Sequence, residues 1–331
     1  EDIRRCNHCA TCDELRMNET PHRRCRVNPA FLREREMAVV PAETKKKVLV
    51  VGAGAAGLEA ARVAAERGHE VTLCEKESVL ALELNLATMV KGTVCENVPA
   101  LIDWLTSQAK KTPGLTIKTK TTVTPDFVRA MKPDAVIVAT GGVYGAPDVP
   151  GIDLGIVSTV PQLTRIGRKA AQALRRKRHQ QALPDRPAGH RQELRRPRSS
   201  DRRRARRDLP AQTREKTSRC SKIWTRWERG CRRGTRAGRL SGCGQNDVET
   251  ITGVEYRSID KRGITYVKDG EERYLKADSI LVFKSPGSGL SLYDQLKDLA
   301  PEVYPIGACQ GPGSTLMVDA VGQGRAVALK L

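Results

Sequence analysis

A short apolar run followed at once by three closely spaced glycines is the feature that most constrains what this chain can fold into. Residues 48–51 are Val-Leu-Val-Val, which is typical of a strand buried on both faces. A glycine-rich turn over residues 52–57 follows, and residues 58–67 have the apolar spacing of a helix. Residues 71–75 are predicted to form a second strand. This order of elements predicts a parallel β–α–β unit.

The glycine-rich turn has the pattern Gly52-x-Gly54-x-x-Gly57 between a strand and a helix, the context in which this pattern is informative. The first glycine permits a tight turn, the second lets the backbone approach a diphosphate, and the third lets helix and strand pack closely. Glu75 ends the second strand, where a carboxylate can accept hydrogen bonds from both hydroxyls of a ribose. The alternative is a glycine turn without a ligand. The residues predicted to form this nucleotide site are Gly52, Ala53, Gly54, Ala56, Gly57, Glu75 and Lys76.

Further elements follow along the chain. Residues 98–110 are predicted to be an amphipathic helix, and residues 135–139 a buried strand that ends at Thr140-Gly141-Gly142. Residues 247–275 have the pattern of short antiparallel strands joined by Asp and Gly turns. The last elements expected are strands over 279–283 and 303–306 and a helix over 316–331. The overall fold class predicted is α/β.

One block of 77 residues carries the whole charge imbalance of the chain. The net charge is +20, and residues 168–244 alone hold 26 Lys and Arg against 6 Asp and Glu. The block contains no Val, Phe, Tyr or Met, so it is not expected to supply buried strands. Clustered cations can bind phosphates, which makes a basic nucleic-acid-binding protein the alternative function. Trp224 and Trp227 are the only aromatic residues of the block, too few for a base-stacking surface.

Four cysteines near the start of the chain have spacings of two, two and twelve intervening residues: Cys6, Cys9, Cys12 and Cys25. Thiolates are the ligands that iron–sulfur clusters and zinc prefer, and the spacing alone does not decide between them. Unligated thiols are the third alternative. Ten cysteines in 331 residues do not make a disulfide scaffold, and such a cluster in a cytosolic protein more often holds metal. The arginines expected to offset the thiolate charge are Arg4, Arg5, Arg23, Arg24 and Arg26.

These motifs together resemble the C-terminal half of the iron–sulfur flavoenzymes, the old yellow enzyme-like family of trimethylamine dehydrogenase, 2,4-dienoyl-CoA reductase and 2-enoate reductase. The resemblance is carried by Arg-Cys-Asn-His-Cys-Ala-Thr-Cys at residues 5–12, Arg-Cys-Arg-Val-Asn-Pro at 24–29, the glycine turn at 52–57 and Ala-Thr-Gly-Gly at 139–142. It covers residues 3–166 and 245–331. It implies a Rossmann-like FAD/NAD(P)-binding domain of the pyridine nucleotide–disulfide reductase type.

The resemblance also implies a domain order and cofactors. Residues 1–45 form a cluster segment, residues 46–150 and 277–331 an FAD- or ADP-binding domain, and residues 151–276 the remnant of an NAD(P)H-binding domain. The four cysteines would ligate a 4Fe–4S cluster. Gly52, Gly54, Gly57 and Glu75 would hold the ADP half of the nucleotide. The residues that would face the flavin half are Thr140, Gly141, Gly307 and Ala308.

The chain departs from the family pattern in its ends and in its flavin-facing residues. The N-terminal FMN barrel where substrate reacts is missing, and the sequence begins with Glu1 instead of Met, as in a processed chain or a fragment. The usual Gly-Gly after the ribose carboxylate is Ala81-Leu82, and the usual Gly-Asp near the C-terminus is Gly307-Ala308. Because both changes concern the flavin half, ADP or weakly held FAD is the alternative to tightly bound FAD.

The basic block is the remaining departure, because it stands where the family has its second nucleotide-binding fold. A pair of compensating frameshifts, near residues 167 and 244, would explain it. Family-like sequence stops before the block and resumes after it, and the block has the length of the missing domain core. Arg codons of the CGN type, read one base later, encode Ala, Gly, Val, Asp or Glu. The nucleotide sequence would test this hypothesis.

The function expected from these observations is electron transfer. The chain would be the C-terminal part of an FMN, iron–sulfur and FAD or ADP oxidoreductase that acts on enoate, enoyl-CoA or amine substrates, with NAD(P)H or another electron carrier. NAD(P)H and FMN are expected only in the intact family member, and this part alone need not be active. No catalytic residue is assigned. Partners expected are the missing barrel, an electron donor or acceptor and a second copy of the chain, in the cytoplasm and without a membrane.

Overall fold

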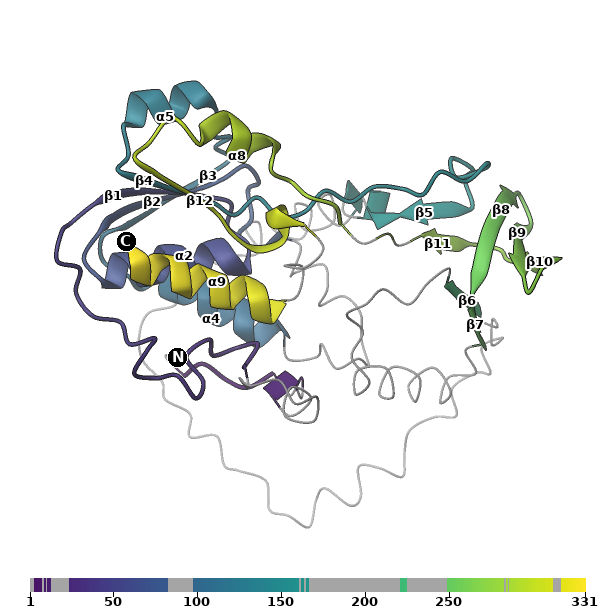
Figure 1. The fold of residues 1–331 in the computed structure, drawn as a ribbon, viewed down its shortest axis with the longest axis horizontal. Coiled ribbons are helices and arrows are strands. Elements are labelled where there is room, and N and C mark those ends of the chain that lie inside the picture. Colours follow the sequence, from purple (N-terminus) through teal and green to yellow (C-terminus); the bar gives the residue numbers. More distant parts are fainter. Residues whose placement is uncertain are drawn as a thin grey trace, which may run out of the picture.

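A five-stranded parallel sheet with helices on both faces forms the larger part of the structure (Figure 1). The order of strands across the sheet is β12-β4-β1-β2-β3. These strands are β1 (Lys47–Val51), β2 (Glu70–Glu75), β3 (Leu115–Thr119), β4 (Ala135–Val138) and β12 (Glu302–Pro305). The computed structural model describes residues 3–7, 9, 11–12, 24–82, 98–160, 162–163, 165–166, 221–224, 249–282, 284, 286–311 and 317–331.

Helices cover the two faces of this sheet. In Figure 1, α2 (Ala55–Glu66), α4 (Val98–Lys111) and α9 (Met317–Lys330) lie on one face, and α5 (Pro125–Met131) and α8 (Ser291–Leu296) lie on the other. Because successive side chains of a strand point to opposite faces, each core receives alternate residues of β1. Val48 and Val50 join the core beneath α2, and Leu49 joins the core beneath α5 and α8. None of the helices in the described ranges is long and apolar enough to cross a membrane.

The predicted β–α–β unit is confirmed, and the α/β fold class with it. The helix begins three residues earlier than expected, at Ala55, because Gly54 serves as its N-cap. The sequence did not indicate β3 or α5. β3 is only partly buried and therefore lacks a strong apolar pattern, while α5 is short and begins where the Thr124 hydroxyl accepts the Phe127 N–H.

Smaller sheets make up the rest. β5 (Val157–Thr159) pairs in parallel with β11 (Ile280–Val282). The predicted antiparallel set is confirmed for three strands, β8 (Val254–Asp260), β9 (Gly263–Lys268) and β10 (Glu271–Lys276). The prediction is wrong for β7 (Glu249–Thr252), which pairs in parallel with β6 (Ser221–Trp224).

β6 lies inside the basic block, where no strand was expected. A strand is held to its neighbour by backbone N–H and C=O groups, which every residue type except proline supplies, so poverty in apolar residues did not prevent this pairing. The rest of the block lies outside the described residues. The frameshift hypothesis and the nucleic-acid-binding alternative therefore concern a part of the chain that the structure does not describe.

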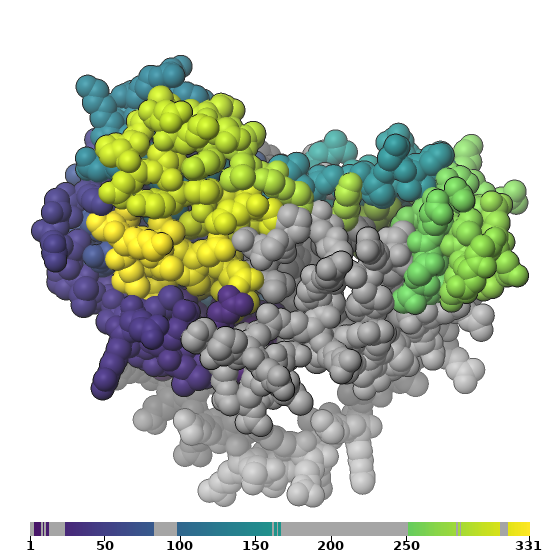
Figure 2. Space-filling model, viewed as in Figure 1, coloured from purple at the N-terminus to yellow at the C-terminus, as the bar shows by residue number. Residues whose placement is uncertain are grey.

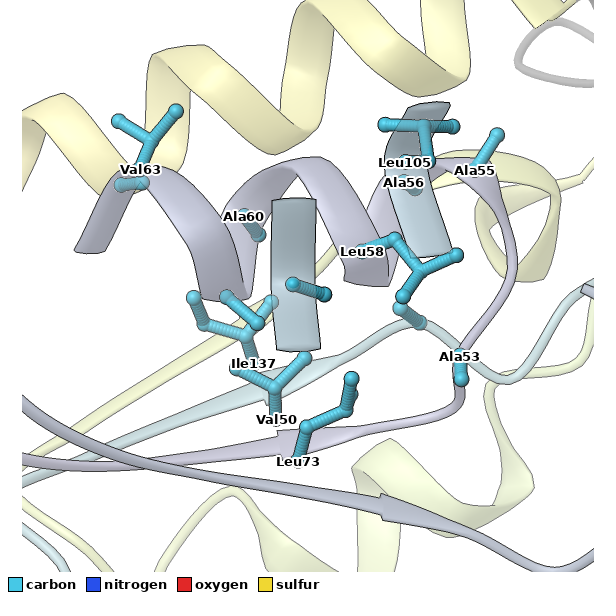
Figure 3. Packing of buried hydrophobic residues seen from close by; sticks show 14 of the residues in the cluster. Val50, Ala53, Ala55, Ala56, Leu58, Ala60, Val63, Leu73, Leu105 and Ile137 are labelled. Carbon is cyan, nitrogen blue, oxygen red and sulfur yellow. The ribbon is translucent and has the colours of Figure 1, made fainter. Parts of the chain in front are cut away.

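The helix α2 is enclosed by its neighbours. Every residue from Ala55 to Ala65 is buried, and Figure 3 shows Leu58 directed toward the strands and Val63 toward α9. The closest approach to α9 is at Gly324, where an added Cβ atom would lie 2.4 Å from the carbonyl oxygen of Ala56. The packing of α2 on α9 therefore requires a residue without a side chain at position 324.

The substitution Gly324→Ala is expected to lower the free energy of unfolding by about 1–3 kcal/mol, because α2 and α9 must move apart to admit the methyl group. Gly322→Ala on the same helix is the matched control, since its Cβ would meet nothing within 4 Å. The control is expected to be neutral or to stabilise by up to about 1 kcal/mol through helix propensity. Urea unfolding of both variants measures the difference, and equal effects would contradict this account of the packing.

A buried histidine lies at the start of β2. His69 is 1% exposed, its Nδ1 accepts the Lys46 N–H at 3.1 Å, and its Nε2 has no partner among the described residues. Burial, and then the charges of Arg67 and Lys46, hold the pKa of His69 below its ordinary value. His69 is therefore neutral in the folded chain at neutral pH.

The folded state is expected to lose stability in acid through His69. His69 binds a proton more readily in the unfolded chain than in the folded one. The free energy of unfolding is therefore unaffected by His69 above about pH 6.5, and it decreases as the pH falls from there toward the lowered pKa of the folded state. His69→Asn keeps a side-chain acceptor but removes the titration. Urea unfolding at about pH 7.5 and about pH 5.5 is expected to show a smaller pH dependence in this variant. An unchanged pH dependence would mean that other groups cause the acid sensitivity.

Candidate functional site

The candidate site lies at the edge of the sheet where the parallel strands end. Gly52 follows β1, Glu75 ends β2, Thr140 comes soon after β4 and Gly307 follows β12. The carboxyl ends of neighbouring parallel strands meet at one edge of a sheet, which is where α/β folds bind ligands. The sheet order therefore brings together residues that are up to 255 positions apart in the sequence.

The three glycines of the turn have different surroundings. An added Cβ at Gly52, where φ is +102°, would lie 2.4 Å from the Ala139 carbonyl oxygen. At Gly57 it would lie 1.9 Å from the Gly52 carbonyl oxygen. At Gly54 it would meet nothing within 4 Å. The first and third glycines are thus required by packing within the protein, whereas the second faces open space.

Open space at Gly54 adjoins the start of α2. Gly54 is the N-cap of the helix, no side chain caps it, and its first turn carries no acidic residue. The first N–H groups of a helix lack partners within the helix and attract anions. Two features therefore suit a diphosphate beside Gly54. No side chain fills the space there, and no acidic residue of the first turn neutralises the partial positive charge of the helix N-terminus.

Glu75 is hydrogen-bonded to the glycine turn. One carboxylate oxygen accepts the Ala53 N–H at 2.8 Å and the other accepts the Glu77 N–H at 2.9 Å. These two bonds hold the carboxylate at the end of β2. Lys76 is exposed. Ala53 and Ala56 are buried, and the Ala53 backbone is already bonded to Glu75 and to the Ala81 N–H.

The residues predicted to face the flavin half lie where three chain segments converge. Gly141 has φ of +79°. An added Cβ at Gly289 would lie 2.6 Å from the Gly141 carbonyl oxygen. A Cβ at Gly142 would lie 2.7 Å from Pro286 and 3.1 Å from the Ala308 oxygen. Segments 140–143, 286–289 and 307–311 are therefore packed closely against one another.

The turn after β12 is held by a residue that the sequence did not indicate. Gln323 on α9 accepts the Gly307 N–H through Oε1 at 2.6 Å, and the same oxygen accepts from the Gln310 side chain at 3.1 Å. Gly307 has φ of +71° and lies against Ala56. In the sequence, Gln323 stands out only as a polar residue in a helix of mostly small and apolar residues.

The first departure from the family pattern has a structural consequence. Ala81, which stands where the family has glycine, adopts φ of +54°. This left-handed conformation costs a residue with a Cβ atom about 1 kcal/mol relative to glycine. Ala81 is buried and donates its N–H to the Ala53 carbonyl at 2.9 Å. The backbone at residue 81 thus retains a glycine-like shape beside the turn.

None of the four N-terminal cysteines forms a disulfide bond. Cys6 is exposed and the other three are half-buried. The described residues contain no group of three or more potential ligands around one point, so the structure does not assemble the predicted cluster site. Cys25 shows one trait of a ligand thiolate, because its Sγ accepts N–H groups from Val27 at 3.4 Å and Asn28 at 3.3 Å.

Two of the arginines expected to offset the thiolate charge also have carboxylate partners. Arg4 pairs with Glu59 of α2 at 3.2 Å, and Arg24 pairs with Asp319 of α9. Their role beside the thiolates stays a prediction. Glu59 was itself missed, although a carboxylate in an otherwise apolar helical stripe was a signal.

Comparison with known proteins gives the chain its class. Residues 46–178 match the family model of pyridine nucleotide-disulphide oxidoreductases. NADH oxidase of Thermoanaerobacter brockii is 35% identical over 154 residues, 46% of this chain and 23% of the oxidase. Cinnamate reductase of Clostridium sporogenes is 37% identical over 151 residues, 44% of this chain and 22% of the reductase.

A third relative has a different named activity. A probable N-methylproline demethylase of Rhizobium meliloti is 39% identical over 147 residues, 43% of this chain and 21% of the demethylase. The chain thus spans less than a quarter of the length of each of these curated relatives.

Solved structures agree on the fold. A 2-naphthoyl-CoA reductase complex superposes with a TM-score of 0.74 at 23% identity, over 100% of this chain and 47% of that one. Histamine dehydrogenase from Rhizobium sp. 4-9 superposes with a TM-score of 0.68 at 18% identity, over 100% of this chain and 48% of that one. About half of each neighbouring chain has no counterpart here.

The fold and the match over residues 46–178 show that the chain contains an α/β nucleotide-binding domain like those of the pyridine nucleotide-disulphide oxidoreductases. The resemblance to the family of trimethylamine dehydrogenase, 2,4-dienoyl-CoA reductase and 2-enoate reductase that the sequence indicated is confirmed by these relatives and structures.

Gly54 provides a direct test of the nucleotide site. Gly54→Val is expected to leave the folded structure intact, because its side chain enters open space, but to weaken binding of ADP by at least about tenfold through a clash with the diphosphate. Gly155→Val is the control, since Gly155 also faces open space but lies between Leu154 and Ile156, which pack in the separate core around β5. Calorimetric titration with ADP measures both variants. Equal affinity for ADP in the two variants would contradict the proposed site.

Proposed function

We propose that this chain is the electron-transfer part of a larger oxidoreductase, with a nucleotide at the glycine turn and a 4Fe–4S cluster at the four N-terminal cysteines. The observation that carries the proposal is the open cradle at Gly54, bounded by an uncapped helix start and by the fixed carboxylate of Glu75. Its chemistry matches the diphosphate and ribose of an adenine nucleotide. The relatives supply the redox class.

In this proposal the chain itself binds and orients. The N–H groups at the start of α2 receive the diphosphate, and Glu75 accepts hydrogen bonds from the ribose. The tight contacts of Gly52 and Gly57 keep strand and helix close enough for both to act on one ligand. A bound flavin would supply the change between two-electron and one-electron transfer.

The identity of the nucleotide depends on the flavin half. Gly52, Gly54, Gly57 and Glu75 are all suited to ADP. In contrast, the family's carboxylate after the Gly307 turn is replaced by Ala308, which cannot accept a hydrogen bond through its side chain. We therefore propose ADP, or FAD held less tightly than in the family, as the ligand.

The cluster proposal rests on donor chemistry and sequence spacing. Four cysteines outside any disulfide bond suit a 4Fe–4S cluster, and the Val27 and Asn28 N–H groups that donate to the Cys25 sulfur would stabilise a ligated thiolate. Cys6, Cys9 and Cys12 would have to approach Cys25 on binding iron, because the described residues do not group them. We therefore propose these four cysteines as the iron ligands, to be tested by substitution.

The proposed substrate class is supported by the names of the relatives. One is named for an enoate, one for an N-methylated amine and one for NADH. We propose that the intact protein acts on an enoate, an enoyl-CoA or an amine at an FMN barrel outside this chain, and exchanges electrons with NAD(P)H or another carrier. The half of the neighbouring chains without counterpart here is in keeping with such a partner domain.

Anaerobic purification tests both cofactors. The chain is expected to hold about four iron and four sulfide per molecule, with broad absorbance near about 400 nm. Heat should release about one adenine nucleotide per chain, identified as ADP or FAD by absorbance and mass. Colourless protein without iron, sulfide or adenine would overturn the proposal.

Substitutions separate the two cofactors. Cys25→Ser is expected to abolish iron binding and to leave nucleotide binding unchanged, because the thiol lies outside the glycine turn. Cys309→Ser is the control, since Cys309 is buried and donates to the Val138 and Ile306 carbonyls. Retention of iron by Cys25→Ser would remove Cys25 from the ligand set.

A further inference from the structure

A cluster of buried charges joins the cysteine-bearing N-terminal segment to the nucleotide-binding helix. Its centre is Glu59, a fully buried residue of α2 two positions after Gly57. Burial of an ionised carboxylate is tolerated only with compensating charges and hydrogen bonds. Three arginines from three different parts of the chain provide the compensating charges.

The three contacts reach Glu59 from separate segments. Arg4 Nη1 lies 3.2 Å from both carboxylate oxygens. Arg62 Nη2, one turn along α2, lies 2.9 Å from Oε1. Arg325 Nη1 of α9 lies 3.5 Å from the same oxygen. Glu59 therefore contacts the N-terminal segment and both helices that pack around the glycine turn.

Arg4 is held by an aromatic ring as well as by Glu59. Its guanidinium carbon is 4.2 Å from the centroid of the Trp104 ring on α4, which is a favourable cation–π distance. Its Nε and Nη2 have no hydrogen-bond partner among the described residues. Glu59 and Trp104 are thus the interactions seen to fix Arg4, which is two residues before Cys6.

The far end of the cysteine-bearing segment is tied to the same helices. Arg325 donates through Nε and Nη2 to the Met37 carbonyl, at 2.9 and 2.6 Å. Arg24, next to Cys25, pairs with Asp319 on α9. Figure 2 shows the N-terminal residues lying directly against the C-terminal helix. Both ends of the segment that carries the four cysteines therefore meet α2 or α9.

The charges in this cluster favour an ionised Glu59. Burial alone would raise its pKa, but the Arg4 and Arg62 guanidinium groups hold the pKa of Glu59 below its ordinary value. Arg62 also pairs with Glu66 at 2.6 Å. Counting Glu59 and Glu66 against three arginines, the cluster has one cation in excess, close in sequence to thiols that become anionic on binding metal.

We propose that Glu59 and Arg4 are positioning residues that hold Cys6, Cys9 and Cys12 against the nucleotide-binding helix α2. The inference rests on the proposed iron–sulfur function for its purpose, because an anchored segment keeps the thiols ready for metal and at a fixed distance from the nucleotide. The anchor itself is formed by this chain without metal. It can therefore be tested whether or not a cluster binds.

Thiol reactivity in the metal-free full chain tests the anchor. Arg4→Met removes the charge and keeps an apolar side chain over Trp104. The alkylation rates of Cys9 and Cys12, both half-buried, are expected to rise about tenfold as the segment is released. Buried Cys74 and Cys309 are internal controls and should react as slowly as before, because the sheet remains folded. Peptide mass spectrometry after timed alkylation measures all four thiols.

Two further variants keep the test decisive. Arg35→Met makes the same charge change at an exposed residue of the same N-terminal segment and is expected to leave Cys9 and Cys12 protected. Arg4→Lys keeps a cation near Glu59 but loses the planar guanidinium group, so a rise of about threefold is expected, with Cys74 and Cys309 unmoved. Unchanged rates in Arg4→Met, or an equal rise in Arg35→Met, would overturn the proposal.

Iron loading separates this inference from the function on which it rests. After reconstitution with iron and sulfide, Arg4→Met is expected to hold less iron than Arg35→Met and to show a weaker absorbance near about 400 nm. Equal iron in the two variants would contradict the positioning role. If the unmodified chain holds no iron, the cluster proposal fails, and the alkylation rates still decide whether Arg4 anchors the segment.

Discussion

The close packing of α2 is the constraint on which the rest of this structure depends. The helix lies so near β1 that a Cβ at Gly57 would come within 1.9 Å of the Gly52 oxygen, and so near α9 that a Cβ at Gly324 would come within 2.4 Å of the Ala56 oxygen. Small residues on α2 and glycines opposite them make these distances attainable. The same closeness brings the start of the helix to the edge where the strands end.

Enclosing α2 has an electrostatic consequence. Its two central charged residues, Glu59 and Arg62, are removed from water, and a buried charge without a partner costs several kcal/mol. Glu59 and Arg62 pair with each other, and further partners for Glu59 come from outside the helix, Arg4 from the N-terminal segment and Arg325 from α9. One packing requirement therefore accounts both for the closeness of the glycine turn to α2 and for the ionic contacts that hold the cysteine-bearing segment.

The two halves of the candidate nucleotide site differ in how well they match the family. The ADP half has an open cradle and a carboxylate fixed by two N–H groups. The flavin half has Ala81 in a glycine-like conformation and Ala308 in place of a carboxylate. A site with one intact half and one altered half favours a ligand that makes its strongest contacts through ADP.

Local sequence determined the elements around the glycine turn, because strand, turn and helix preferences act between residues close along the chain. The run at 48–51, the glycines at 52–57 and Glu75 were predictable in that way. The contacts of Glu59 with Arg4 and Arg325, the Gln323 bond to Gly307 and the pairing of β6 with β7 were not. These contacts join segments that only the tertiary structure brings together, because the pattern of side chains along one segment does not specify a partner 16 to 266 positions away.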